Sequence, residues 1–177
     1  MTSDAIIRPA TPADLTDIQK IYAHHVLTGL ASFEEVPPDL EEMRRRFATL
    51  TDAGFPYLAA EMDGRVLGYA YCGPYRPRPA YRYSVENSVY LTPEAAGRGI
   101  GRRLLEALIE RATALGKRQM VAVIGDSANH ASIGLHTALG FRMVGKIEGA
   151  GFKHGRWVDS VLMQRPLGPG LSSPPPA

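Results

Sequence analysis

The chain has 177 residues, of which 45% are hydrophobic and 21% are charged, and its formal net charge at pH 7 is +2. A chain of this size and composition is expected to form one globular domain, because it is too apolar to be disordered and has no apolar run long enough to cross a membrane. The small net charge argues against a nucleic-acid-binding protein, and the single cysteine, Cys72, together with the lack of an export signal in Met1–Pro9, predicts a cytoplasmic protein without disulfides.

The N-terminal part carries signals for one strand, two helices and a hairpin. Thr11-Pro12 and Asp39 each precede apolar residues at helical spacing, so each is expected to start a helix. Asp63-Gly64 separates two apolar runs and predicts a hairpin, because a tight turn requires positive φ angles at its centre. The expected elements are a strand over 5–9, helices from 12 and from 39, and strands over 57–62 and 66–72.

Strands and helices alternate in the C-terminal part. Residues 73–81 contain too many prolines for a central strand and are expected to form a surface loop. The other expected elements are strands over 84–91, 120–124, 141–147 and 157–164 and helices over 100–115 and 129–139. Residues 166–177 are expected to be a disordered tail. This order predicts an α/β fold with a mixed sheet and helices on both faces, in one domain over residues 1–165.

A glycine-rich segment links the strand that ends in Val89-Tyr90-Leu91 to the helix that begins near Ile100. Such a turn directs unpaired backbone N–H groups and the positive end of the helix dipole toward one point, which favours phosphate binding. Arg98 and Arg102 could add ionic contacts. The segment lacks the Gly-Lys-Ser/Thr of the nucleotide P-loop and the glycine spacing of dinucleotide-binding folds. On this pattern alone, a glycine-rich connection without a ligand is also possible.

Residues 96–101, Ala-Gly-Arg-Gly-Ile-Gly, resemble the acetyl-CoA loop of the GNAT acetyltransferase superfamily, in which Gln or Arg stands at the position of Ala96. The stretches Asn129-His130-Ala131-Ser132 and 135–141, Leu-His-Thr-Ala-Leu-Gly-Phe, look like the second half of the GNAT core. Further similar stretches lie at 32–34, 70–74, 76–81, 85–90, 121–125 and 151–159, and these narrow the resemblance to the phosphinothricin acetyltransferase branch. The resemblance covers roughly residues 5–165.

The resemblance implies the GNAT fold, with a mostly antiparallel sheet of about seven strands that splays in its middle. It also implies acetyl-CoA as cosubstrate, no metal, direct transfer within a ternary complex, and a homodimer. The missing side chain at Ala96 should weaken one contact without removing a site built largely from main-chain amides. The residues expected to bind acetyl-CoA are Val89, Tyr90, Leu91, Gly97, Arg98, Gly99, Ile100, Gly101, Arg102, Asn129 and Ser132.

Two residues are implied to be catalytic. Glu86 matches the general base of this branch, which must take a proton from an α-amine whose ordinary pKa is near 8. A carboxylate that merely pairs with an arginine of residues 76–82 is the alternative. His136 stands where many GNAT enzymes place a tyrosine that protonates the leaving thiolate, and a structural histidine is the alternative there. A backbone N–H on the strand of Tyr90 and Leu91 is expected to stabilise the thioester oxyanion.

The acceptor is implied to be a small amino acid with a second anionic or polar tetrahedral group, as in phosphinothricin, methionine sulfoximine and methionine sulfone. Guanidinium groups bind such oxyanions in bidentate fashion, although the same arginines could simply form a basic, solubilising loop. A CoA-binding module without transfer activity and a general amino-acid or peptide N-terminal acetyltransferase are the alternative functions. The residues expected to bind the acceptor are Phe33, Arg76, Arg78, Tyr81 and Tyr90.

Overall fold

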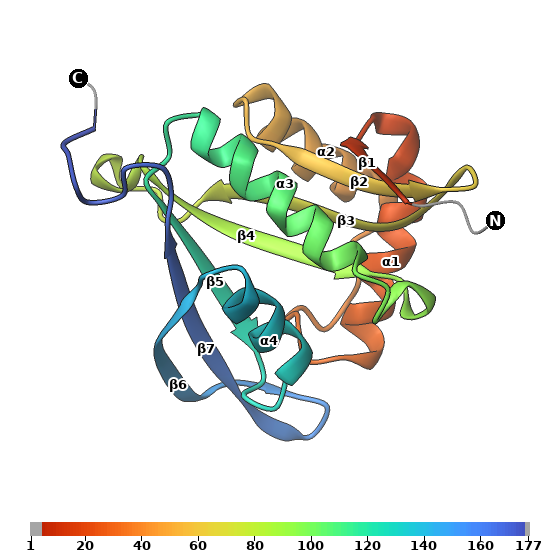
Figure 1. Ribbon diagram of the computed structural model, residues 1–177. Helices are drawn as coiled ribbons and strands as arrows, with labels where there is room; N and C mark the ends of the chain where they lie inside the picture. The colour runs from red at the N-terminus through yellow and green to blue at the C-terminus, as the bar shows by residue number, and fades with distance from the viewer. Residues whose placement is uncertain (1–4, 176–177) are drawn as a thin grey trace.

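The structure is a computed structural model that describes residues 5–175. A seven-stranded sheet with the strand order β1-β2-β3-β4-β5-β7-β6 forms its centre (Figure 1). All neighbouring strands are antiparallel except β4 and β5, which are parallel. The strands are β1 (Ile6–Pro9), β2 (Tyr57–Met62), β3 (Arg65–Pro74), β4 (Ser84–Leu91), β5 (Gln119–Gly125), β6 (Arg142–Lys153) and β7 (Arg156–Pro166).

Helices cover both faces of this sheet, which confirms the α/β fold predicted from the sequence. In Figure 1, α3 and α4 lie in front of the sheet, and α1 and α2 lie behind it. One apolar cluster, which includes Ile18 and Tyr69, fills the α1/α2 face, and another, which includes Leu104 and Met120, fills the α3/α4 face. Within residues 5–175, no helix combines the length and apolar character that a membrane span needs. The helices are α1 (Leu15–Thr28), α2 (Leu40–Asp52), α3 (Ile100–Ala114) and α4 (His130–Ala138).

The local signals in the sequence act as predicted. The Asp39 carboxylate accepts a 2.8 Å hydrogen bond from the Glu42 N–H and so caps α2. Asp63 and Gly64, with φ angles of 52° and 76°, form the turn between β2 and β3. Gly116 has a φ of 74° and follows the end of α3, where a residue in the left-handed region terminates the helix.

Several element boundaries differ from the predictions, and three of the differences have a clear physical reason. The first helix begins with a single 3-10 turn at Pro12–Asp14, and the α-helix starts only at Leu15. β3 extends through Pro74 into the segment predicted as a loop, because a proline at the end of a strand costs few ladder hydrogen bonds. β6 continues to Lys153, beyond the predicted end at 147. The sequence does not indicate this extension, because the side chains of β6 are largely exposed and two register shifts interrupt their alternation.

The prediction of a disordered tail from residue 166 is wrong at its first two residues. Pro166 pairs with Gln119 as the last residue of β7. The Leu167 N–H donates to the Arg118 carbonyl at 2.9 Å, and the Leu167 side chain, which is 1% exposed, belongs to the apolar cluster on the α3/α4 face. Burial of this one large apolar side chain therefore ties the start of the segment to the fold, and residues 176 and 177 of the predicted tail lie outside the described residues.

The two central strands pair over only part of their length. Ser84–Asn87 of β4 align with Gln119–Ala122 of β5, and no further partners are found between these strands within residues 5–175. β5 nevertheless remains paired with β7 as far as Gly125. Figure 1 shows β4 and β5 diverging toward the lower part of the view. The splay in the middle of the sheet that the resemblance implies is therefore confirmed.

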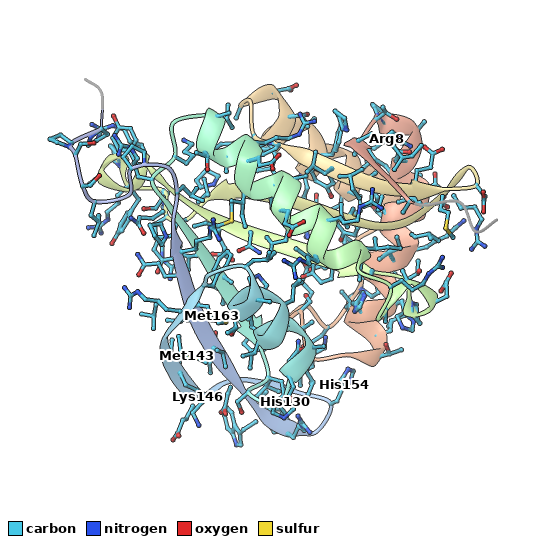
Figure 2. The ribbon with its side chains drawn as sticks, viewed as in Figure 1. Arg8, His130, Met143, Lys146, His154 and Met163 are labelled. Carbon is cyan, nitrogen blue, oxygen red and sulfur yellow. The ribbon has the colours of Figure 1, made fainter. Side chains whose placement is uncertain are left out.

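Acid is expected to destabilise the protein through Asp14, which lies between β1 and α1 and pairs with Arg8 of β1. Figure 2 labels Arg8. The carboxylate accepts two hydrogen bonds from Arg8 at 2.8 Å and one from the Thr11 N–H, and the Arg8 bond lowers the Asp14 pKa from 3.8 to about 2. A depressed pKa stabilises the fold above the unfolded pKa, and this contribution of about 2 kcal/mol is lost as the pH falls from about 4 to about 2.

Urea unfolding of wild type and Asp14→Asn at pH 7 and pH 3 measures this contribution. Asp14→Asn should be less stable at pH 7, and the difference should shrink at pH 3. Asp17→Asn, which changes a partly exposed carboxylate in the first turn of α1, is the matched control and should show little difference at either pH. A constant difference for Asp14→Asn at both pH values would contradict the assignment.

Candidate active site

β4 carries side chains of different chemistry to the two faces of the sheet. Tyr90 is paired with Tyr69 and packs against the apolar cluster on the α1/α2 face, whereas Val89 and Leu91 pack against the cluster on the α3/α4 face. Because side chains alternate along a strand, Glu86 and Ser88 share the face of Tyr90, and Asn87 shares the face of Val89. The two predicted catalytic residues therefore lie on opposite faces of the sheet. Glu86 of β4 points to the α1/α2 face, and His136 belongs to α4 on the other face.

A cleft opens where β4 and β5 separate, and we call it the β4–β5 cleft. Both strands, the start of α4 and the loop before α2 contribute to its walls. Its lining residues are Ala31, Asn87, Ser88, Val89, Tyr90, Ala122, Val123, Ile124, Gly125, Asn129, Ser132 and His136. The structure thus brings five of the predicted site residues to one cleft, from segments that lie far apart in the sequence.

Backbone N–H groups of β4 are directed into this opening. The Thr92 N–H donates to the Leu67 carbonyl of β3 at 2.8 Å. N–H directions alternate along a strand, so the N–H groups of Leu91 and Val89 point away from β3, toward the side where β5 has separated. These donors are free of the sheet ladder and lie at the position where the sequence predicts an oxyanion donor.

The predicted phosphate loop adopts the required backbone conformation. Gly97 and Gly99 have φ angles of 72° and 76°, and a Cβ built on either would meet no atom within 4 Å. Glycine is therefore needed here for its φ angle and not for space. Gly99 is the N-cap of α3, so the N–H groups of the first helical turn, including those of Ile100 and Gly101, face the loop without intrahelical partners. An anionic group fits this position.

The two arginines of this loop are differently engaged. Arg98 is exposed and contacts the Met62 sulfur at 3.3 Å. Arg102 donates to Glu106 at 2.8 Å, one turn further along α3. Both side chains lie at the surface, where such contacts are weak, so both arginines are able to turn toward an anion.

Asn129 has a structural function in addition to the one that the resemblance implies. It is the N-cap of α4, and its Oδ1 accepts a 3.1 Å hydrogen bond from the Ser132 N–H. The Asn129 Nδ2 is 3.5 Å from the Gly125 carbonyl at the end of β5. Both Asn129 and Ser132 line the β4–β5 cleft. They are therefore placed to contact a ligand there, while Asn129 also fixes the start of α4.

Glu86 is half-buried and lies on the α1/α2 face of β4. Burial raises its pKa above the ordinary value, and the positive charge of Arg76 partly opposes this rise. Among the described residues, no arginine forms an ion pair with Glu86, in contrast to the alternative considered from the sequence. A carboxylate with a raised pKa and no fixed partner suits a general base.

His136 is 4% exposed and is held at both ring nitrogens. Its Nδ1 lies 2.8 Å from the Ser132 carbonyl, and its Nε2 lies 2.9 Å from Nδ2 of Asn87. The ring also packs edge-to-face on Phe141. Burial lowers the pKa of His136, although the hydrogen bond to Ser132 acts in the opposite direction. The imidazole is therefore neutral at pH 7 and tightly positioned.

The loop before α2 covers the ends of β5 and β6. The Phe33 ring would be only 3.0 Å from a Cβ on Gly151, so it packs directly on the β6 backbone. Lys153 of β6 is 3% exposed and donates a 2.7 Å hydrogen bond to the Ser32 carbonyl. Burial lowers the Lys153 pKa. These contacts hold Phe33 beside the open ends of the strands, where an acceptor pocket is expected.

The predicted arginine loop is exposed and aromatic. Arg76 lies over the Tyr75 ring at 4.8 Å, and Tyr75 meets Tyr81 edge-to-face at 5.7 Å. Arg78 is the N-cap of a short 3-10 helix, Pro79–Tyr81. Neither Arg76 nor Arg78 forms an ion pair with any described residue, so both guanidinium groups are available to an anion. Arg76 acts electrostatically on Glu86, but no direct contact of Arg78 or Tyr81 with Glu86 is present in the described part.

Two residues near the cleft were missed by sequence reasoning. His25 of α1 is 2.7 Å from the Leu91 carbonyl through Nε2, and its ring lies 5.3 Å from that of Tyr90. It therefore anchors the splayed end of β4. Asn87 holds His136, as described above. His25 lies in no motif. Asn87 lies in the stretch 85–90, in which the resemblance implies a function only for Glu86, Val89 and Tyr90. Alternation along 84–91 places it on the inner face. Cys72 is a buried core residue, and burial raises its pKa to about 12.

Comparison with known proteins agrees with this geometry. Residues 7–162 match the acetyltransferase (GNAT) domain family. The chain is 56% identical over 169 residues to a phosphinothricin N-acetyltransferase of Alcaligenes faecalis, covering 96% of this chain and 86% of that protein. It is 46% identical over 171 residues to an L-methionine sulfoximine/L-methionine sulfone acetyltransferase of Pseudomonas aeruginosa, covering 96% and 99% of the two chains.

Solved structures give the same result. A phosphinothricin acetyltransferase from Sinorhizobium meliloti in complex with acetyl-CoA superimposes with a TM-score of 0.95 at 51% identity, covering 98% of this chain and 94% of that one. A putative acetyltransferase from Salmonella typhimurium with its cofactor acetyl-CoA gives a TM-score of 0.94 at 39% identity, with 99% of each chain covered. No group of three or more possible metal ligands occurs among the described residues. The splayed sheet, the glycine loop at the start of α3 and these similarities show that the chain belongs to the GNAT family of acetyltransferases.

Proposed function

We propose that this acetyltransferase moves the acetyl group of acetyl-CoA to the α-amine of a small amino acid that bears a second polar tetrahedral group. Phosphinothricin, methionine sulfoximine and methionine sulfone are the acceptors of this class. The single observation that carries the proposal is the β4–β5 cleft, which is lined by Val89, Asn129 and Ser132, all expected to bind acetyl-CoA, and by His136. The similarity to the two kinds of acetyltransferase named above supports the choice of acceptor.

Each side of the cleft then has its own task. The N–H groups at the start of α3 would hold the pyrophosphate of acetyl-CoA, and the cleft would hold its pantetheine arm, so that an activated acetyl group is presented to the α1/α2 face. There, Glu86 takes a proton from the ammonium group of the acceptor and leaves the amine free to attack the thioester carbon. The C–S bond breaks as the amide forms, and the CoA thiolate takes the second proton that the nitrogen loses. The free N–H group of Val89, the donor nearer to Asn87, donates to negative charge that develops on the carbonyl oxygen. Arg76 and Arg78 bind the anionic groups of the acceptor, beside Phe33 and Tyr81.

A kinetic panel tests the choice of acceptor. Release of free thiol from acetyl-CoA should be measured with L-phosphinothricin, methionine sulfoximine, methionine sulfone, the twenty common amino acids and a short peptide. Turnover should be fastest with the first three. Equal turnover with ordinary amino acids would favour the general amino-acid acetyltransferase, and turnover of the peptide alone would favour the N-terminal one. Tight binding of CoA in calorimetry with no turnover of any amine would identify a binding module.

We further propose that two copies of the chain associate through the strands β5, β6 and β7. Large apolar side chains are exposed there, whereas helices cover most apolar side chains of β2–β4. Figure 2 shows Met143 and Lys146 along β6 at the edge of the molecule. Several exposed apolar side chains on neighbouring strands are typical of an interface. They are Val123, Met143, Val144, Ile147, Phe152 and Trp157.

Trp157→Glu is expected to convert a dimer into a monomer. Trp157 is 71% exposed in the single chain, and a glutamate at this position would place a charge in the interface. Sedimentation velocity over a concentration series measures this change. Leu171→Glu is the control, since Leu171 is 89% exposed outside β5–β7 and should not alter the sedimentation coefficient. A wild-type monomer at all concentrations would rule out the dimer.

Residues 1–165 are proposed to form a single catalytic domain, and the sheet that runs from β1 to β7 supports this proposal. A cytoplasmic location likewise stays a proposal. It has the support of the single cysteine, Cys72, whose thiol is fully buried and has no disulfide partner in the chain.

A further inference from the structure

The hydrogen bonds of His136 define one protonation state of its ring. The Ser132 carbonyl can only accept, so the Nδ1 atom 2.8 Å away must carry the hydrogen. In a neutral imidazole, Nε2 then carries a lone pair and accepts from a donor. The neighbour of Nε2, at 2.9 Å, is the Asn87 amide, which must therefore turn its Nδ2–H toward the ring. The Ser132 carbonyl thus fixes the tautomer of His136, and His136 in turn fixes the orientation of the Asn87 amide.

This orientation leaves the other end of the Asn87 amide without a partner. Asn87 is 6% exposed and lines the β4–β5 cleft. Its Oδ1 is buried and accepts no hydrogen bond from any described residue. An unpaired buried carbonyl is costly, and buried polar groups in native proteins nearly always have partners. A ligand in the cleft that offers an N–H group would remove this cost.

The position of Asn87 along β4 indicates which ligand group it meets. Asn87 is the last residue of β4 that pairs with β5, so it lies at the closed end of the cleft. The start of α3, where an anion fits, lies beyond Leu91 at the open end. The strand between Asn87 and Leu91 spans about 13 Å at the usual rise per residue. A pantetheine arm that starts at the phosphate loop must therefore reach Asn87 with its distal part, which contains an amide next to the thiol.

We propose that Asn87 Oδ1 accepts a hydrogen bond from the pantetheine amide N–H nearest the thiol, and that His136 is the positioning residue that turns Oδ1 toward it. The proposal rests on acetyl-CoA as the cosubstrate. It gives His136 a function different from the one that the resemblance implies, since in this arrangement neither ring nitrogen holds a proton that is free to be given to a thiolate. Asn87 contacts the cosubstrate, and His136 acts only through Asn87.

Calorimetric binding of CoA tests the proposal without requiring acetyl transfer. Asn87→Ala should raise the Kd of CoA about tenfold, the effect expected for one lost hydrogen bond to a buried acceptor. A CoA analogue with an ester oxygen in place of the amide nitrogen nearest the thiol should lose the same factor on wild type. On Asn87→Ala the analogue and CoA should bind alike. A second analogue, with the ester oxygen in place of the other amide nitrogen, is the control. Its loss of affinity relative to CoA should be the same on Asn87→Ala as on wild type.

Controls separate this contact from a loss of structure. Thr137→Ala removes an exposed hydroxyl that bonds only to its own helix, and it should leave the Kd of CoA unchanged. The comparison of CoA with the ester analogue on wild type needs no substitution at all. If wild type binds both equally, or if Asn87→Ala still distinguishes them, the proposal is wrong. Failure of the acceptor panel with normal CoA binding would instead count against the proposed acceptor alone.

Nitrogen-15 chemical shifts of the His136 ring provide a second test. The free enzyme should show the tautomer with hydrogen on Nδ1, and the ring should stay neutral down to a pH below the ordinary histidine pKa. His136→Gln should weaken CoA binding less than Asn87→Ala, since it disturbs the orientation of the amide but keeps the acceptor. It should also leave the alkaline side of the kcat profile unchanged. If kcat of wild type falls at high pH and this fall is absent in His136→Gln, His136 is a proton donor and its positioning role is overturned.

Discussion

Glu86→Gln is expected to lower kcat by about 10²- to 10⁴-fold, the usual contribution of a general base. The amide fills the same space and keeps the hydrogen-bonding capacity of the side chain, but it cannot accept a proton from an ammonium group. The substitution loses the charge attraction to the ammonium group but keeps a hydrogen-bond acceptor for it, so KM for the acceptor should change much less than kcat. Steady-state kinetics with saturating acetyl-CoA measure both constants.

The pH profile distinguishes a base from a residue that only shapes the pocket. A carboxylate is an effective base only when it is deprotonated, and burial raises the Glu86 pKa above its ordinary value. The kcat of wild type should therefore fall as the pH drops through this raised pKa. Glu86→Gln should lack this acidic limb and retain only the rise of kcat/KM at higher pH, where the acceptor amine itself loses its proton.

Matched variants make this interpretation firm. Glu110→Gln neutralises an exposed carboxylate of α3 and should leave kcat and its pH profile unchanged. Arg76→Lys keeps the positive charge that opposes the rise of the Glu86 pKa, whereas Arg76→Met removes it and should shift the acidic limb to higher pH. A Glu86→Gln enzyme with wild-type kcat would show that another group, or the bulk solvent, accepts the proton.

Local signals in the sequence predicted the elements well because each depends on a few neighbouring residues. The Asp39 cap and the Asp63-Gly64 turn are examples, since a cap needs only a side-chain oxygen and a turn needs only positive φ angles. β6 was predicted too short for the opposite reason. Its side chains are exposed on most of their surface, so no burial on one face imposes an alternating pattern.

The arrangement of the site depends on contacts between segments that are distant in the sequence. The resemblance placed Glu86 and His136 at one site, but they lie on opposite faces of β4, because Glu86 shares the face of Tyr90 and His136 bonds to Asn87 on the other face. The bond between Asn87 and His136 joins residues 49 positions apart, and the bond between His25 and Leu91 joins residues 66 positions apart. Periodicity within one element carries no information on such pairs.

A close backbone approach at the end of β5 leaves no room for a side chain at Gly125. A methyl group built on Gly125 would overlap the carbonyl oxygen of Leu30 and come within 3.2 Å of the Ala31 Cα. Both partners are backbone atoms, so no rotation of a side chain can relieve the overlap. The segment of Leu30 would have to move away from β5. That segment continues into Ser32, whose carbonyl is held by Lys153, and into Phe33, which packs on β6.

Gly125→Ala is therefore expected to destabilise the protein by about 3 kcal/mol, at the upper end of the usual range for overpacking. For a chain of this size, this corresponds to a fall in Tm of about 6–12 °C. The KM for the acceptor should also rise, because displacement of Leu30 moves Phe33 at the mouth of the pocket. Thermal unfolding and steady-state kinetics measure the two effects.

Gly134→Ala provides the opposite case within the same protein. Gly134 lies in α4, has no atom within 4 Å of its Cβ position and is exposed, so alanine should stabilise the helix by about 0.5–1 kcal/mol. The two substitutions add the same methyl group, and only the surroundings differ. If Gly125→Ala were as stable as wild type, the loop before α2 would be free to move, and the contacts of Ser32 and Phe33 could not be what holds the acceptor pocket in place.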